Sequence, residues 1–256
     1  MKEDQFSLDE TTLSVDLSDA TQAVKESRFE DALNLLKVLL KENPNHIDIL
    51  YLSAVSTRFL KQFEVSLKHI EQLLFNAPDM GRAYQELGHL NRDMGNEEKA
   101  VMHYRQACEL NPALPSSWSY LHKYFEKIQN KPAADHALEQ IKKLQSLPGL
   151  LLFIEQILNE GRLGLAETKC RAFLKENPTH TYAMSLLAEI ANRFGYFDDA
   201  EFLLQKAVEF KPKDGDLRLK YASILRKKQK FAQTTEQVNI LCDQFPDNLN
   251  YQAQKA

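Results

Sequence analysis

Residues 81–112 read GRAYQELGHLNRDMGNEEKAVMHYRQACELNP and contain two amphipathic segments joined by a short polar turn. In each segment apolar residues recur at the three- and four-residue spacing of a helix with one buried face. Gly95 lies in the turn, where a helix end often requires a positive φ that glycine adopts without strain. Pro112 ends the second segment because proline lacks the amide hydrogen that would continue a helix. The stretch predicts two helices, which the small residues Gly88 and Ala100 allow to pack closely.

The same pattern recurs along the chain with a period of 34 residues. Each complete period ends at a proline, in two series: Pro44, Pro78 and Pro112, then Pro178, Pro212 and Pro246. A small residue lies twelve positions before each proline: Ala32, Ser66, Ala100, Ala166, Ala200 and Thr234. The 66 residues between Pro112 and Pro178 make one period of 34 and one of 32, so this interval contains a repeat that lacks the proline and is slightly short.

This pattern resembles the tetratricopeptide repeat, whose signature is a large apolar residue, Leu-Gly or Leu-Ala, an aromatic residue, and later Ala and Pro. The third repeat matches at Tyr84, Leu87, Gly88, Ala100, Tyr104 and Pro112, and the sixth at Met184, Leu187, Ala188, Ala200, Leu204 and Pro212. The resemblance covers residues 13–248. It implies an all-α fold, a right-handed α-solenoid of about seven helical hairpins with a concave groove.

The repeats divide the chain into four parts. Residues 1–12 are expected to form an N-terminal tail or cap, and residues 13–146 to form repeats one to four. Residues 147–248 are expected to form repeats five to seven, and residues 249–256 the start of a further, truncated helix. The division at residue 147 rests on a Leu-Pro-Gly junction and on the missing two residues, which predict a stacking defect there.

Composition and motifs favour a binding protein over an enzyme. The net charge of −4 and the isoelectric point of about 6.0 give no sign of a nucleic-acid surface. The chain has three widely spaced cysteines and no CxxC, HExxH or GxxxxGK[ST] motif. We therefore expect no catalytic residue, metal or cofactor, and reduced, buried cysteines. The longest apolar run, residues 150–154, is too short to span a membrane, which predicts a soluble, cytoplasmic protein.

The resemblance also places candidate partner-binding residues, because positions 2, 5, 9 and 12 of each first helix commonly face the ligand in tetratricopeptide proteins. The first part of this surface is basic, which favours an acidic or C-terminal peptide segment. Ordinary solvated helix faces are the other interpretation. The family's carboxylate-clamp pattern is not reproduced, since Tyr51 and Val55 replace the Lys and Asn of that pattern. The candidates are Tyr51, Arg58, Arg82, Gln85, His89, Arg92, Ser119, Lys123, Tyr182, Glu189, Asn192 and Arg226.

Two further segments each allow two interpretations. Residues 150–154 with Ile157 and Leu158 are either deep core or an apolar strip for a partner or a second copy. A basic run near the C-terminal end is either a solvated helix and turn or a docking face for an acidic partner. The run contains Arg218, Lys220, Arg226, Lys227, Lys228 and Lys230.

Three functions follow from these features. The first is a scaffold that binds a partner protein or peptide in the groove. The second rests on residues 147–167, 180–204 and 245–256, which look like the N-terminal repeat region of bacterial tetratricopeptide-sulfotransferase proteins. That resemblance implies a downstream domain that uses phosphoadenosine phosphosulfate, and this chain would then position a substrate or mediate assembly. The third is assembly into a homodimer.

Overall fold

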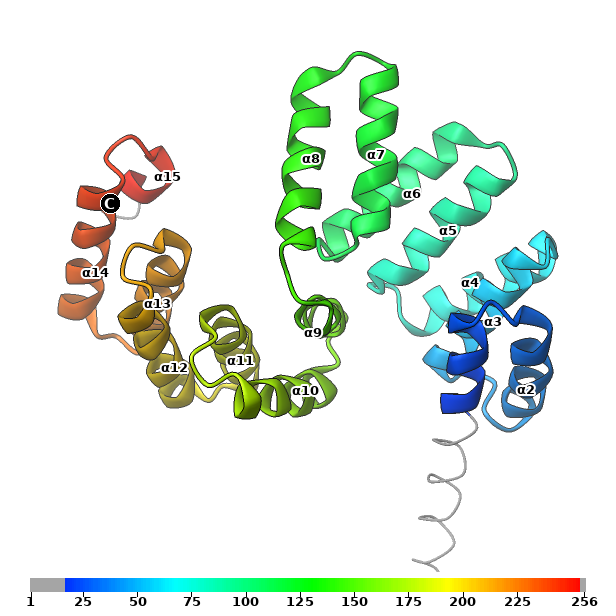
Figure 1. The fold of residues 1–256 in the computed structure, drawn as a ribbon, viewed down its shortest axis with the longest axis horizontal. Helices are drawn as coiled ribbons and strands as arrows, with labels where there is room; N and C mark the ends of the chain where they lie inside the picture. Colours follow the sequence, from blue (N-terminus) through cyan, green and yellow to red (C-terminus); the bar gives the residue numbers. More distant parts are fainter. Residues whose placement is uncertain (1–16, 254–256) are drawn as a thin grey trace, which may run out of the picture. The chain divides into compact units, whose positions relative to one another are not determined.

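The computed structural model describes residues 17–253, and it forms helices joined by short turns, with no strand among those residues (Figure 1). This confirms the predicted all-α class. The predicted tail or cap at residues 1–12 lies outside the described residues. The chain divides into two compact units, Met1–Ser146 and Leu147–Ala256, and each is treated by itself below.

Unit 1 consists of four consecutive helical hairpins. Residues 17–25 are helical and pair with α2 to form the first hairpin, and each later hairpin consists of a first helix, here called an A helix, and a second, here called a B helix. The A helices are α3 (Ile47–Phe59), α5 (Gly81–Asp93) and α7 (Pro115–Lys127). The B helices are α2 (Phe29–Glu42), α4 (Phe63–Asn76), α6 (Glu97–Leu110) and α8 (Lys131–Gln145).

Unit 2 continues the pattern with three hairpins and the start of another helix. Its A helices are α9 (Gly149–Asn159), α11 (Thr181–Phe194) and α13 (Gly215–Lys227). Its B helices are α10 (Leu163–Glu176), α12 (Phe197–Phe210) and α14 (Phe231–Gln244), and the short α15 (Leu249–Gln252) follows the last of them. With unit 1, the described residues thus contain the seven predicted hairpins.

The short repeat owes its length to α9. The A helix of the fifth repeat begins at Gly149, which is 34 residues after Pro115, so the junction before it keeps the normal period. α9 has 11 residues, whereas α7 and α13 have 13 each, and α10 consequently begins two residues early. The shortening that we assigned to the junction at residues 147–149 therefore lies within the following helix.

Each turn between an A helix and its B helix contains one residue in the left-handed region. Glycine supplies it in three turns, with φ of 79° at Gly95, as predicted, and of 76° at Gly161 and 81° at Gly195. The other four turns use residues at the equivalent positions, with φ between 57° and 61°: Ser27, Lys61, Gln129 and Gln229. The turn geometry is therefore imposed by hairpin packing, because a non-glycine residue in this region costs about 1–2 kcal/mol.

Two glycines of the fifth repeat allow the cost of a side chain at a positive φ to be measured without any steric clash. Gly161 has a positive φ and Gly164 is helical, and a Cβ added at either would meet no atom within 4 Å. Gly161→Ala is expected to lower the free energy of unfolding by about 1 kcal/mol, because alanine is strained at a positive φ. Gly164→Ala is expected to raise it by up to about 1 kcal/mol through helix propensity. Thermal unfolding of the two variants would test this, and a shift of the same sign in both would contradict it.

The apolar segment of α9 is core. Leu151, Ile154, Ile157 and Leu158 are all buried, and they pack with residues of α10 and α11 in one cluster. Leu150 and Phe153 are the exposed apolar residues of this segment. The alternative interpretation as a partner or dimer strip is therefore wrong for the four buried side chains, and a charge introduced at Leu151 or Leu158 would unfold the unit.

Candidate functional site

In each unit the predicted partner-binding residues other than the buried Arg58 lie on one side of the A helices, which we call the A-helix face of that unit. Side chains on this face join neighbouring A helices through pairs that lie 35 residues apart, one residue more than the repeat period. In unit 1 the guanidinium of Arg58 donates to Asp93 (2.8 Å). In unit 2, Lys220 donates to Ser185 and Lys227 to Asn192, both at 2.8 Å. These cross-repeat contacts fix the side chains between adjacent repeats.

Arg58 lies inside the protein and not on the predicted contact surface. It is 6% exposed and forms an ion pair with Glu86 of α5, which is 2% exposed. Burial raises the pKa of Glu86, and the charge of Arg58 opposes that rise. Since a buried carboxylate needs a partner, Arg58 holds α3 against α5. The structure thus gives this residue a role between repeats, in contrast to the predicted partner contact.

His89 and Arg92 lie together beside the ring of Tyr104 from α6. The Nδ1 atom of His89 lies 2.6 Å from the hydroxyl of Tyr104 and 3.4 Å from a guanidinium nitrogen of Arg92. Because the guanidinium can only donate, Nδ1 is the acceptor, and the ring proton sits on Nε2. Burial, followed by the charges of Arg58 and Arg92, lowers the pKa of His89 to about 4. His89 is therefore a neutral, positioned group at pH 7.

Three other predicted residues of unit 1 are held by neighbours. The guanidinium of Arg82 lies over the ring of Tyr51, 4.8 Å from its centre. Gln85 accepts a hydrogen bond from Ser117 of α7 (3.0 Å). Ser119 is half-buried on α7, and Lys123 is exposed one turn further along the helix. In unit 1 the structure thus places the predicted residues on three consecutive A helices, most of them in fixed positions.

In unit 2 the predicted residues belong to a mixed polar network. Tyr182 donates to Glu155 of α9 (2.7 Å), and burial followed by this carboxylate raises the pKa of the phenol. Glu189 pairs with Arg193 (3.0 Å), and the amide of Asn192 lies beside both Glu189 and Lys227. Arg226 is exposed near the end of α13. This face carries both signs of charge, as the equivalent face of unit 1 does, where Asp93 pairs with Arg58 and Arg92.

The basic run at residues 218–230 is not a free cationic surface. Arg218 is 6% exposed and donates to Gln237 (2.6 Å) and to the carbonyl of Pro212 (2.8 Å). Lys228 and Lys230 both form ion pairs with Glu201 of α12. The interpretation of this run as a docking face is therefore wrong for these three residues, which are used within the unit.

The three cysteines belong to the hydrophobic core. The three cysteines are buried and free, as predicted. Burial raises the pKa of Cys108 to about 12 and that of Cys170 to about 11, so both remain thiols at neutral pH. Within residues 17–253 no three His, Cys, Asp or Glu side chains come together in a manner suited to a metal ion. Over the same residues, no helix combines the length and the apolar character that crossing a bilayer requires.

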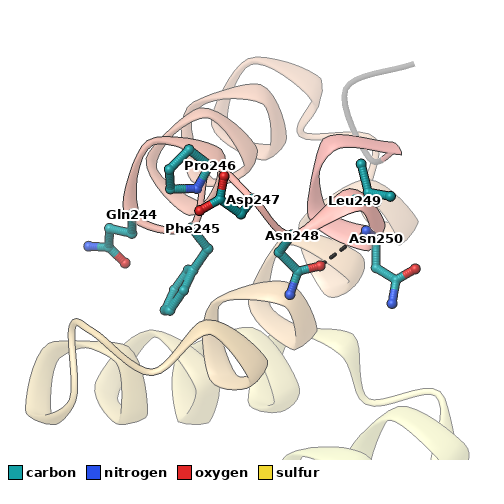
Figure 2. A pocket seen from close by; sticks show the side chains of 7 residues that line it. All are labelled: Gln244, Phe245, Pro246, Asp247, Asn248, Leu249 and Asn250. Carbon is teal, nitrogen blue, oxygen red and sulfur yellow. Dashed lines mark hydrogen bonds between the residues drawn. The ribbon is translucent and has the colours of Figure 1, made fainter.

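Two hollows were not foreseen from the sequence. One is an open hollow along the loop after α14, where the Asn248 side chain accepts hydrogen bonds from the backbone of Asn250 (3.0 Å) and Tyr251 (3.3 Å) (Figure 2). The other is an apolar cleft between α6, α7 and α8. No periodic signal in the sequence marks Trp118 as part of a cleft.

Comparison with known proteins supports the repeat. Residues 81–114 match the sequence model of the tetratricopeptide repeat, and the other hairpins of the described residues follow the same helix pattern. No protein with a curated function matches the chain. The resemblance to tetratricopeptide-sulfotransferase proteins stays a prediction.

Solved structures with a similar fold include a thermophilic TPR protein of Thermus thermophilus. It is 23% identical, with 83% of this chain and 98% of that chain covered and a TM-score of 0.46. YrrB, described as a TPR protein with an unusual peptide-binding site, is 15% identical over 73% of this chain and 97% of that chain, with a TM-score of 0.38. The pilF protein of Pseudomonas aeruginosa is 12% identical over 95% and 96%, with a TM-score of 0.40. At these identities the likeness concerns the fold alone.

Proposed function

We propose that this chain of tetratricopeptide-type hairpins is a scaffold that binds a partner protein, and that the A-helix face of unit 1 receives an acidic segment of that partner. The observation that carries the proposal is the fixed array of polar and aromatic side chains on α3, α5 and α7. Arg82 rests on Tyr51, Gln85 is held by Ser117, and His89 is held by Tyr104. Side chains that are already ordered lose little conformational entropy when a ligand binds.

The residue types on this face also suit protein binding. Tyrosine and arginine are the residues enriched at the energetic centres of protein interfaces. Tyr51 and Tyr120 are half-buried, and Arg92 is 43% exposed and pairs with Asp93 (2.7 Å). Lys123 adds an exposed cation and forms no ion pair in the part of the chain that the structure describes. An acidic partner segment would therefore meet Lys123 and would compete with Asp93 for Arg92, whose position is set in advance.

We expect the partner to crosslink to the A-helix face and to depend on its two exposed cations. A photo-crosslinking amino acid in place of Ser119 would capture, in the source cells, a partner bound to the A-helix face. The same amino acid in place of Phe75, an exposed residue of the B helix α4, would capture a partner bound to that helix. Reversing two charges with Arg92→Glu and Lys123→Glu is expected to reduce the crosslinked partner roughly tenfold, about 1.4 kcal/mol. Higher ionic strength should reduce it as well.

A control variant distinguishes the effect of charge at the A-helix face from the effect of the changed net charge of the protein. Lys37→Glu and Lys68→Glu make the same change of net charge on exposed positions of α2 and α4. This control is expected to leave the yield at position 119 unchanged. Equal crosslinking from positions 119 and 75, or an equal loss in both double variants, would show that the A-helix face of unit 1 is not the binding surface.

A further inference from the structure

The cleft between α6, α7 and α8 is built from one side-chain stripe of each helix. Its residues recur at three- and four-residue spacing on every helix, and they span about two turns, roughly 10 Å, of α7 and α8 and about one turn of α6. Its volume of about 560 Å³ is within the usual range for a binding cleft. The lining residues are Arg105, Cys108 and Glu109 of α6, Trp118, Leu121 and Phe125 of α7, and Ala133, His136 and Gln140 of α8, with Pro112 between the first two helices.

The floor of the cleft is apolar and well fixed. Leu121, Phe125 and Cys108 are buried and belong to one core cluster, against which Trp118 packs. The indole of Trp118 donates to the carbonyl of Pro112 (2.8 Å), and the centres of the Trp118 and His136 rings lie 5.5 Å apart in an edge-to-face arrangement. An indole with a satisfied N–H and an accessible ring surface is a suitable contact for an apolar side chain.

The rim of the cleft has two charges of opposite sign, one helical turn apart. The guanidinium of Arg105 lies over the ring of Phe125 at 5.1 Å, and Glu109 follows four residues later on the same face of α6. Both side chains are exposed, and neither forms an ion pair among residues 17–253. The other rim is formed by neutral Gln140 and by His136. The cleft therefore has a cationic position and an anionic position above a continuous apolar floor.

We propose that this cleft binds an amphipathic helix of a partner protein, with apolar side chains on the floor, an acidic residue at Arg105 and a basic residue at Glu109. A helix presents apolar residues at positions i, i+3 or i+4 and i+7, which is the spacing of the three stripes that form the cleft. Oppositely charged residues four positions apart on such a helix have the same separation as Arg105 and Glu109. None of the residues that line the cleft is among the candidates on the A-helix face, so this inference does not depend on the binding proposed for that face.

Trp118 makes the cleft directly observable, because it is the only tryptophan in the chain. Three synthetic helical peptides would share the same leucine positions and differ at two flanking sites four residues apart. One carries Glu and Lys, the second two Glu, and the third two Lys. Titration of each peptide into the full chain, followed by Trp118 fluorescence, gives three affinities. We expect the Glu/Lys peptide to bind the natural chain most tightly.

Charge reversal at each rim position makes the test specific. Arg105→Glu leaves two acidic groups and is expected to move the preference to the Lys/Lys peptide, and Glu109→Arg is expected to move it to the Glu/Glu peptide. Each change should alter relative affinity roughly tenfold, because an attraction becomes a repulsion at one site. Lys37→Glu, on α2 outside the cleft, should leave the order of affinities unchanged.

Several results would overturn the proposal. The helical ligand is excluded if no peptide perturbs Trp118 up to millimolar concentration. Identical peptide preferences in all variants would indicate unspecific apolar adsorption in place of recognition. A change in Trp118 emission with protein concentration alone would show that a second copy of the chain fills the cleft.

Discussion

Replacement of Arg58 by methionine is expected to lower the free energy of unfolding by about 3–5 kcal/mol, because Glu86 would remain buried without its cation. Arg58 and Glu86 are 6% and 2% exposed, and they join two consecutive A helices. Urea unfolding followed by Trp118 fluorescence would measure the loss, since the tryptophan lies in the same unit.

The double variant Arg58→Met with Glu86→Leu is the control. Removal of both charges takes away the unpaired carboxylate, so the double variant should recover most of the lost stability. The deficit of the single variant should also shrink at lower pH. Burial raises the pKa of Glu86, and a folded state that prefers the protonated carboxyl gains stability as the pH falls. A double variant as unstable as the single variant would show that the loss comes from packing and not from charge.

Acid is expected to destabilise unit 1 by up to about 3 kcal/mol through His89, over the range from about pH 6.5 to about pH 4. The pKa of His89 is lowered to about 4 by burial and by the charges of Arg58 and Arg92. In the unfolded chain a histidine binds a proton near pH 6.5, whereas in the folded chain it stays neutral until about pH 4. The unfolded state therefore binds more protons in this window, and stability falls as the pH falls. Each pKa unit corresponds to about 1.4 kcal/mol.

The variant His89→Gln isolates this contribution. Glutamine has a carbonyl that can accept from Tyr104, and it does not titrate. The stability difference between the natural chain and the variant should change between about pH 6.5 and about pH 4 and be constant outside that window. Unfolding curves measured at several pH values with Trp118 fluorescence would show it. A difference that is independent of pH would mean that His89 is protonated equally in both states.

The fold could be predicted because its signals are local and repeated. Pro112 and its equivalents mark the ends of B helices, and Gly95, Gly161 and Gly195 mark the turns with a positive φ. Each signal depends on the backbone of a few consecutive residues. The four turns without glycine could not be identified in this way, because at Lys61 and its equivalents the hairpin imposes the conformation on an ordinary residue.

The candidate site was harder to predict because its contacts cross repeats. Helical spacing puts Arg82, Gln85 and His89 on one face of α5, yet it gives no information about burial. Arg58 was expected at the surface, and its two carboxylate partners lie 28 and 35 residues further along the chain. The cleft near Trp118 depends on the separation of three helices, which no single helical pattern encodes.

The cross-repeat contacts also limit how the chain could gain or lose repeats in evolution. Deletion of residues 81–114 would keep the period of 34 and the remaining turns, so the backbone pattern would survive. The deletion would nevertheless bring Tyr120 to the position of Glu86 and Lys127 to that of Asp93. Arg58 would then be buried opposite a phenol and a second cation. The repeats share one backbone structure, but the contacts of their side chains make each repeat specific to its neighbour. The order of the repeats in the chain is therefore constrained.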